Sequence, residues 1–79
     1  MEQVIEIMVF GQLTDVVGTG LFSLPYVPDS DALLQRLYEL HPLLKERKFV
    51  LSIDQRIVRA NQTINSSSKI ALLPPFSGG

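Results

Sequence analysis

The chemically unusual part of this 79-residue chain is its C-terminal stretch, Leu73-Pro74-Pro75-Phe76-Ser77-Gly78-Gly79. The two prolines fix φ and favour an extended conformation in the residue before each of them, so the stretch should project from the body. Gly78 and Gly79 lack a Cβ and can enter clefts that a side chain would block, with a terminal carboxylate at the tip. At polyproline rise, residues 74–79 span roughly 18 Å, enough to reach a site inside another protein.

The plain alternative for this stretch is a slack tail, because chain ends are commonly disordered and often rich in glycine. Adjacent Pro-Pro and Gly-Gly pairs are an uncommon composition, since average usage is only about 7% for Gly and about 5% for Pro. We therefore favour an arm that delivers the terminal carboxylate of Gly79 to a partner.

The rest of the sequence offers little catalytic chemistry. The chain has no cysteine, which excludes disulfides, thiolate nucleophiles and iron–sulfur ligation. Its one histidine, His41, precedes Pro42 at the end of a predicted helix, where a structural role is favoured. We expect no metal site and no cofactor bound by this chain.

Size and charge narrow the classes of partner. A chain of 79 residues makes one domain that buries about 60% of the surface exposed when it is unfolded. Seven Lys and Arg against eight Asp and Glu give a net charge of -1. The sequence has no stripe of basic residues that could neutralise phosphates, so we do not expect it to bind nucleic acid.

The apolar runs are too short to span a membrane, and Met1-Glu2-Gln3 lacks the basic flank of a secretion signal. The cytoplasm is therefore the expected location. A hydrophobic fraction of 46% with a mean hydropathy of +0.21 hints at apolar surface facing a partner.

Hydrophobic patterning predicts strands separated by two helices. A short helix around Leu13, Val16 and Val17 should end at Gly18, and the main helix should begin at Asp29 or Ser30. The predicted strands are Val4–Phe10, Leu21–Val27, Phe49–Ile53, a short one from Ile57–Val58, and Lys69–Leu73. Pro25 requires the second strand to be at an edge, a bulge or a strand end there.

The main helix places Leu33, Leu37 and Leu40 on one stripe, which should pack across the sheet. Residues 61–68 form a polar loop in which Ile64 is the one anchor. We predict an α+β fold with one helical layer on a mixed sheet of four to five strands. The first and last strands should pair in the middle, dividing the chain into a domain of residues 1–73 and an extended tail of residues 74–79.

This order, the length and the ending together resemble the ubiquitin-like β-grasp fold. They are most similar to the MoaD type of the MoaD/ThiS sulfur-carrier family, the small subunit of molybdopterin synthase. The specific part is Ile70–Gly79, a hydrophobic strand followed by Pro-Pro, an apolar residue, a small residue and Gly-Gly. A weaker part is Val9-Phe10-Gly11-Gln12-Leu13 followed by Val17-Gly18. The sequence departs from the family pattern in the turn Asn65–Lys69, where Asp-Gly-Asp is usual, and at Asp54, where Asn is common.

The resemblance implies that an ATP-dependent adenylyltransferase of the MoeB type, similar to ubiquitin-activating enzymes, adenylates the carboxylate of Gly79. Sulfur then displaces AMP and leaves a thiocarboxylate. The loaded tail would enter the large synthase subunit, of the MoaE type, and two deliveries would build the dithiolene of molybdopterin. ATP would be used by the activating partner, and this chain would be no enzyme on its own.

The resemblance also implies roles within the tail. Gly79 carries the sulfur, Gly78 lets the tip enter narrow sites and Ser77 is small enough to follow. Phe76 is expected to plug the mouth of the partner's channel, with the alternative that it folds back onto the carrier's own sheet.

At the root of the tail, Pro74 and Pro75 should hold its direction. Leu73 could belong either to the core or to the partner surface. Three rival functions stay open: a ThiS-like sulfur carrier for the thiamin thiazole, a protein modifier joined to lysines, and a binding module with a slack tail.

Overall fold

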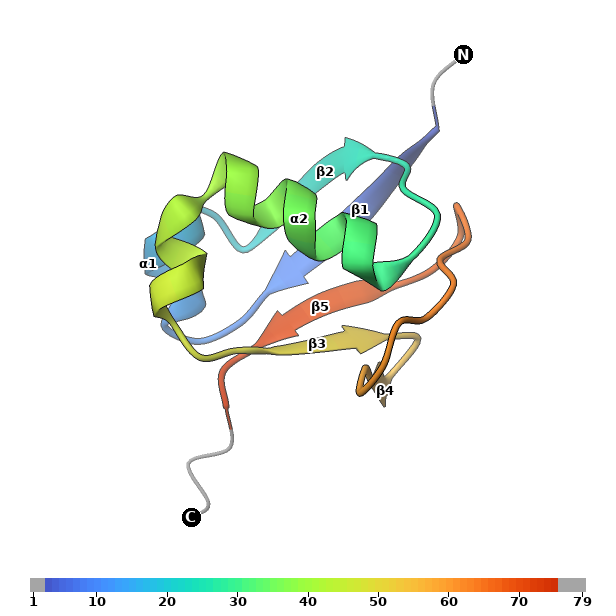
Figure 1. The fold of residues 1–79 in the computed structure, drawn as a ribbon. Coiled ribbons are helices and arrows are strands. Elements are labelled where there is room, and N and C mark those ends of the chain that lie inside the picture. The colour runs from blue at the N-terminus through green and yellow to red at the C-terminus, as the bar shows by residue number, and fades with distance from the viewer. Residues whose placement is uncertain (1–2, 76–79) are drawn as a thin grey trace.

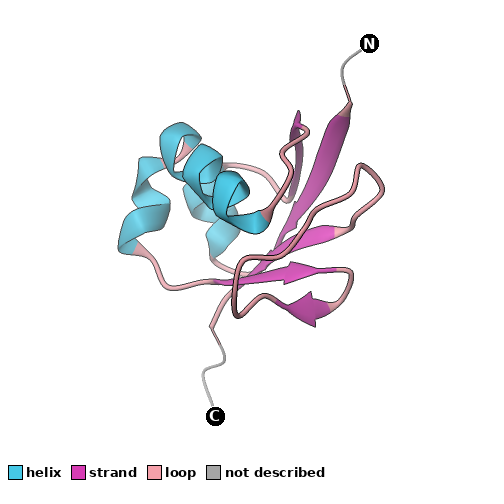
Figure 2. Ribbon diagram, turned by 45° about the vertical axis from the view of Figure 1, so that its right-hand side comes forward, coloured by secondary structure: helices cyan, strands magenta, loops and turns pink. Residues whose placement is uncertain are grey.

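The computed structural model describes residues 3–75, and these form the two predicted layers (Figures 1 and 2). Helices lie on one face of a five-stranded mixed sheet with strand order β2-β1-β5-β3-β4. No helix in this part of the chain has both the length and the apolar character needed to cross a membrane. The elements are β1 (Val4–Val9), α1 (Leu13–Val17), β2 (Leu21–Pro25), α2 (Ser30–Leu40), the 3-10 helix η1 (Pro42–Glu46), β3 (Val50–Ile53), β4 (Arg56–Ile57) and β5 (Ile70–Leu73).

The first and last strands pair in the middle of the sheet, as predicted. β1 and β5 are parallel, with Ile7 opposite Ile70 and Val9 opposite Leu72. β2 lies antiparallel on the outer side of β1, and β3 lies antiparallel on the other side of β5. Because β1 and β5 run the same way, the turn after β1 and the stem after β5 leave the sheet at the same end (Figure 1).

Alternate residues of the strands build the core, since successive side chains of a strand point to opposite faces. The burial pattern of β1 alternates strictly, and the buried set faces α2. The core consists of Ile5, Ile7, Val9, Leu13, Leu24, Leu33, Leu37, Leu44, Leu51, Ile53, Ile64, Ile70 and Leu72. Ile64 therefore anchors the polar loop, as predicted.

One member of the predicted helix stripe is not in the core. Leu33 and Leu37 are fully buried, but Leu40 is 50% exposed. α2 ends at Leu40, with His41 as its C-cap donating its N–H to the carbonyl of Leu37. The chain then turns into η1, and Leu44, at 0% exposure, joins the core instead.

The predicted caps and breaks are confirmed. Gly18 ends α1 with a φ of +93°, a left-handed conformation that glycine adopts without steric cost. The carboxylate of Asp29 caps α2 by accepting the N–H of Ala32 at 2.9 Å. Pro25 is the last residue of β2, which is an edge strand.

The β3–β4 turn is tighter than predicted. Arg56 belongs to β4, opposite Ile53, so Asp54 and Gln55 alone form the connection. Both have positive φ, at 52° and 69°, as the two-residue type I′ hairpin requires. Asp54 also holds the start of β5, because its N–H donates to the Lys69 carbonyl at 2.8 Å and its carboxylate accepts the Lys69 N–H at 3.0 Å.

We predict that Gln55→Gly raises the free energy of unfolding by up to about 1 kcal/mol. Glycine removes the steric cost of the left-handed conformation, and its greater conformational entropy in the unfolded chain cancels only part of this gain. Asp54→Gly should not stabilise, since it removes the acceptor for Lys69. Urea unfolding of both variants measures the difference. Equal shifts in the two variants would contradict the role given to the Asp54 carboxylate.

Candidate functional site

The root of the tail, residues 73–75, is the part of the predicted site that the structure describes. Leu73 is the last residue of β5 and lies opposite Val50 of β3. Its side chain is half-buried on the sheet face away from α2, so it belongs to the outer face and not to the core. Pro74 and Pro75 are exposed. The predicted site residues Phe76, Ser77, Gly78 and Gly79 lie outside the described residues.

The turn that follows β1 contacts the stem. The N–H of Phe10 donates to the Leu72 carbonyl at 3.0 Å, extending the β1–β5 pairing to the last residues of the sheet. Gly11 comes next, with a φ of +61°. A Cβ at Gly11 would lie 2.9 Å from Cγ of Pro74, so the two residues are in close contact.

A shallow groove of about 200 Å³ runs beside the stem. Its lining residues are Gln12, Leu13, Val16, Arg47, Lys48, Pro74 and Pro75. Leu13 is nearly fully buried, whereas Arg47 and Lys48 are exposed and carry positive charge to this side of the stem. Within residues 3–75 the one ion pair joins Arg36 to Glu39 and involves neither groove cation.

The sheet face away from α2, here called the open face, is unusually apolar. One row of successive neighbours in the strand register crosses all five strands, and four of its five members are apolar: Leu21, Met8, Ala71, the buried Ser52 and Ile57. Leu21 is 53% exposed, Met8 40% and Ile57 42%. The row is adjacent to Leu73 at the tail root, so the open face and the stem form one continuous surface. Such a surface is typical of a partner contact.

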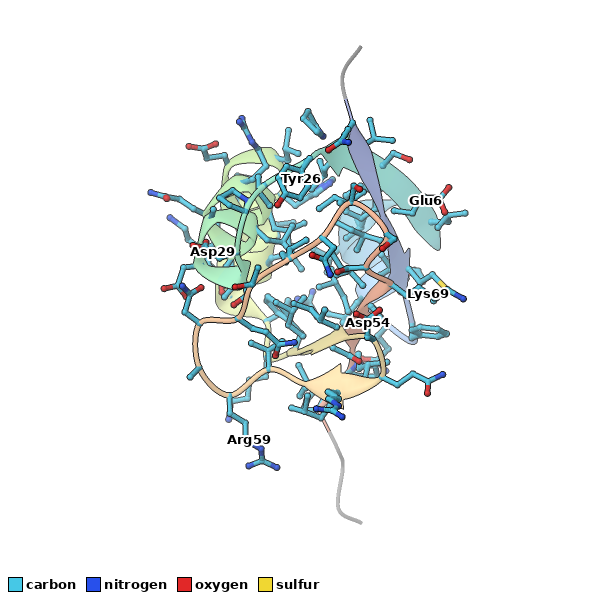
Figure 3. All side chains as sticks on the ribbon, turned by 90° about the vertical axis from the view of Figure 1, so that its right-hand side faces the viewer. Glu6, Tyr26, Asp29, Asp54, Arg59 and Lys69 are labelled. Carbon is cyan, nitrogen blue, oxygen red and sulfur yellow. The ribbon has the colours of Figure 1, made fainter. Side chains whose placement is uncertain are left out.

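Two charged side chains border the open face. Figure 3 shows Glu6 and Lys69 on the side of the sheet away from α2. Both line a groove of about 510 Å³, together with Val4, Met8, Leu21 and residues 66–70. Glu6 is the only charged residue of β1. Its carboxylate therefore places a negative charge among the apolar side chains that β1 presents on the open face.

The loop that precedes β5 is tied to the start of α2. Tyr26 donates its hydroxyl to the Ile64 carbonyl at 2.7 Å (Figure 3). The side-chain oxygen of Asn61 accepts the Asp31 N–H at 2.9 Å, and the buried Ser30 hydroxyl accepts the Gln62 N–H at 2.9 Å. These hydrogen bonds connect residues 26–31, around the start of α2, to residues 61–64 of the loop. Among residues 3–75 no three His, Asp or Glu side chains gather as a group that could hold a metal ion.

Comparison with known proteins decides the family. The model of the ThiS family matches residues 7–79. The chain belongs to the ThiS family. Membership includes the region of the Gly-Gly ending and confirms the resemblance to the MoaD/ThiS carriers.

Solved structures show the same ubiquitin-like β-grasp fold. A Pyrococcus furiosus protein, provisionally assigned as molybdopterin converting factor subunit 1, aligns with a TM-score of 0.80 at 15% identity, over 91% of this chain and 97% of that one. Small archaeal modifier protein 1 of Methanosarcina acetivorans aligns with a TM-score of 0.78 at 20% identity, over 100% and 99% of the two chains. The Haloferax volcanii protein of that name aligns with a TM-score of 0.76 at 20% identity, over 96% and 99%.

Sequence reasoning missed two features of this site. The first is the contact of Gly11 with Pro74, and the second is the position of the cations Arg47 and Lys48 beside the stem. Nothing in the local sequence around these residues indicates that the root of the tail is their neighbour. The open face was suspected from composition, but its location could not be assigned, since β1 and β5 are apolar on both sides.

We predict that the two faces of β1 differ sharply in their contribution to stability. Ile7→Ala should lower the free energy of unfolding by about 2–5 kcal/mol, because it opens a cavity in the core. Met8→Ala should lower it by less than about 1 kcal/mol, because Met8 is partly exposed. Chemical denaturation of both variants tests this, and a large loss in Met8→Ala would mean that the open face serves folding and not contact.

Proposed function

We propose that this chain is the sulfur carrier subunit of a molybdopterin synthase, acting through the C-terminal carboxylate of Gly79. The observation that carries the proposal is ThiS-family membership over residues 7–79, combined with a Pro-Pro stem that continues the central strand β5. The Pro-Pro pattern favours the molybdopterin branch of the family, and the fold shared with the Pyrococcus protein is compatible with that branch.

The chemistry explains why the carrier needs an activating partner. A terminal carboxyl is ionised at neutral pH and resists nucleophilic attack. An adenylyltransferase of the MoeB type uses ATP to form the acyl-adenylate at Gly79 and releases pyrophosphate. A sulfide-level nucleophile (hydrosulfide) then forms a C–S bond while the C–O bond to AMP breaks and the S–H proton is lost, so the chain ends as a thiocarboxylate with no change of oxidation state. This stored nucleophile supplies the sulfur for the dithiolene.

The roles of the tail residues follow from their sizes. Gly79 is the carboxylate carrier, and Gly78 and Ser77 are small enough to pass through a narrow channel. Phe76 stops the insertion at the channel mouth by burying its ring in the partner. Residues 73–75 form the stem, whose first residue is held in the sheet.

The open face is the surface best placed to contact the large synthase subunit, of the MoaE type. Its apolar row is continuous with Leu73, so a partner that receives the tail also covers Met8 and Leu21. The apolar side chains would give the affinity, while Glu6 would fix the register through a partner cation. We propose that both reactions take place in the cytoplasm, where the partners would be present.

A protein modifier is the second candidate, and the two small archaeal modifier structures support it. The same activated Gly79 would then form an isopeptide with lysines of other proteins. Conjugates in cell lysate that disappear on deletion of Gly79 would favour this function. A ThiS-like carrier would instead co-purify with a thiazole synthase.

We predict that co-expression with a MoeB-type adenylyltransferase and a sulfur source converts the C-terminal carboxylate to a thiocarboxylate. Intact mass measurement should show a change that corresponds to the replacement of one oxygen by one sulfur. Fragmentation should place this change at the C-terminus. An unchanged mass in the presence of an adenylyltransferase that loads its own known carrier would reject the carrier function.

We predict that Gly79→Pro, or one residue added after Gly79, abolishes this loading. The proline ring would rigidify and crowd the tip, and the added residue would move the carboxylate out of reach. Gly20→Ala is a suitable control, because Gly20 is not among the glycines with positive φ and a Cβ there would meet only the Val9 carbonyl oxygen, at an ordinary contact distance of 3.8 Å. Normal loading of either tail variant would refute the steric requirement at the tip.

We also predict that Leu21→Glu raises the Kd for the large synthase subunit about tenfold or more, the equivalent of about 1.4 kcal/mol. Leu40→Glu is the matched control, since Leu40 is 50% exposed and Leu21 53% exposed, but Leu40 lies at the end of α2 and not on the open face. Calorimetry with the purified subunits measures both. Equal effects would place the docking surface elsewhere.

A further inference from the structure

We propose that Gly11 is a positioning residue for the tail: it provides a seat for Pro74 and thereby sets the direction in which the stem leaves the sheet. This inference rests on the proposed function, because the direction matters only if the C-terminal carboxylate is delivered to a partner. The observation behind it is the contact itself, in which a Cβ on Gly11 would lie 2.9 Å from Cγ of Pro74, 3.5 Å from its Cδ and 3.6 Å from its Cβ.

The seat is fixed from both sides. On one side, the Gly11 carbonyl accepts hydrogen bonds from the Thr14 N–H at 3.2 Å and the Thr14 hydroxyl at 2.9 Å, which tie it to the first turn of α1. On the other side, the preceding Phe10 N–H is bonded to the Leu72 carbonyl at 3.0 Å. Gly11 therefore cannot yield easily, so a larger side chain there would displace the proline ring.

The seat explains how a stem of two prolines can have a defined direction. Each proline fixes its own φ, but the angle at which the stem leaves β5 depends on contacts with the body. Pro74 rests against Gly11 on one side, and the groove beside it contains the Leu13 and Val16 side chains. A stem pushed off this seat would reach the partner at a different angle, and misplacement of a reacting group by about 1 Å can cost about a hundredfold in rate.

Two glycines of the chain allow a matched test. Gly11 and Gly18 both have positive φ, but a side chain at Gly18 meets nothing within 4 Å. Asparagine tolerates positive φ better than other non-glycine residues. Gly18, with a φ of +93°, is further from the left-handed region that asparagine tolerates than Gly11, with a φ of +61°. Gly18→Asn therefore imposes at least as much backbone strain as Gly11→Asn, and only Gly11→Asn places atoms against Pro74.

The experiment compares the full chains as substrates of a MoeB-type adenylyltransferase, with ATP–pyrophosphate exchange as the measure of adenylation. We expect Gly11→Asn to lower kcat/KM about tenfold relative to Gly18→Asn, through misplacement of the reacting carboxylate, with both variants shown by circular dichroism to be folded at the assay temperature. The double variant Gly11→Asn/Pro74→Ala should regain the activity of Pro74→Ala alone, because alanine lacks the ring atoms that the side chain would meet.

A second measurement tests the seat without any enzyme. In NMR spectra of the wild-type chain we expect a nuclear Overhauser effect between the Gly11 α-protons and the Pro74 γ-protons. Absence of this effect would overturn the inference, as would equal exchange activity of Gly11→Asn and Gly18→Asn or the absence of rescue by Pro74→Ala. If the wild type supports no exchange at all, the proposed function fails, and the nuclear Overhauser effect alone decides whether Gly11 seats Pro74.

Discussion

The parallel pairing of β1 with β5 is the interaction on which the rest of the structure depends. It joins the beginning of the chain to its end in the centre of the sheet, so the strand that leads into the tail is held on both sides, by β1 and by β3. An arm attached to an edge strand would have one neighbour and could fray with it. Here the arm begins from the central strand of the sheet, which has a neighbour on each side, and Leu73 at its root still pairs with Val50.

The same pairing brings the β1–α1 turn to the root of the tail. Parallel strands end at the same edge of a sheet, so Phe10 and Gly11 must lie beside the residues that follow Leu72. This explains why a glycine with positive φ, far from Pro74 in the sequence, contacts the stem. Two requirements meet at Gly11: the backbone must turn sharply into α1, and a proline ring must pass close by.

Local signals in the sequence were enough to predict the five strands and the two α-helices but not η1, and the order of these elements was enough to predict the fold. The stop at Gly18, a helix start at Asp29 or Ser30, and an edge, bulge or strand end at Pro25 were predicted from single residues whose backbone chemistry has few solutions. Leu40 was assigned wrongly because helical periodicity says nothing about where a helix ends. α2 stops at that residue, and a leucine of η1 takes its place in the core.

The site was less predictable than the fold, because it depends on which face of the sheet the helices cover. β1 alternates Ile5, Ile7 and Val9 with Val4, Glu6 and Met8, and β5 alternates two apolar pairs. Glu6 is the one charged signal for the outer face, and the apolar residues on both sides of each strand leave a pattern of period two too weak to locate the exposed surface. Once α2 covers one face, the other becomes an exposed apolar surface that lowers solubility without adding to the core. Such a surface next to the root of the tail is expected if binding to a partner requires apolar contact there. The apolar row then supplies affinity at the place where the stem must be oriented, and the small residues of the tip remain free to enter the partner's site.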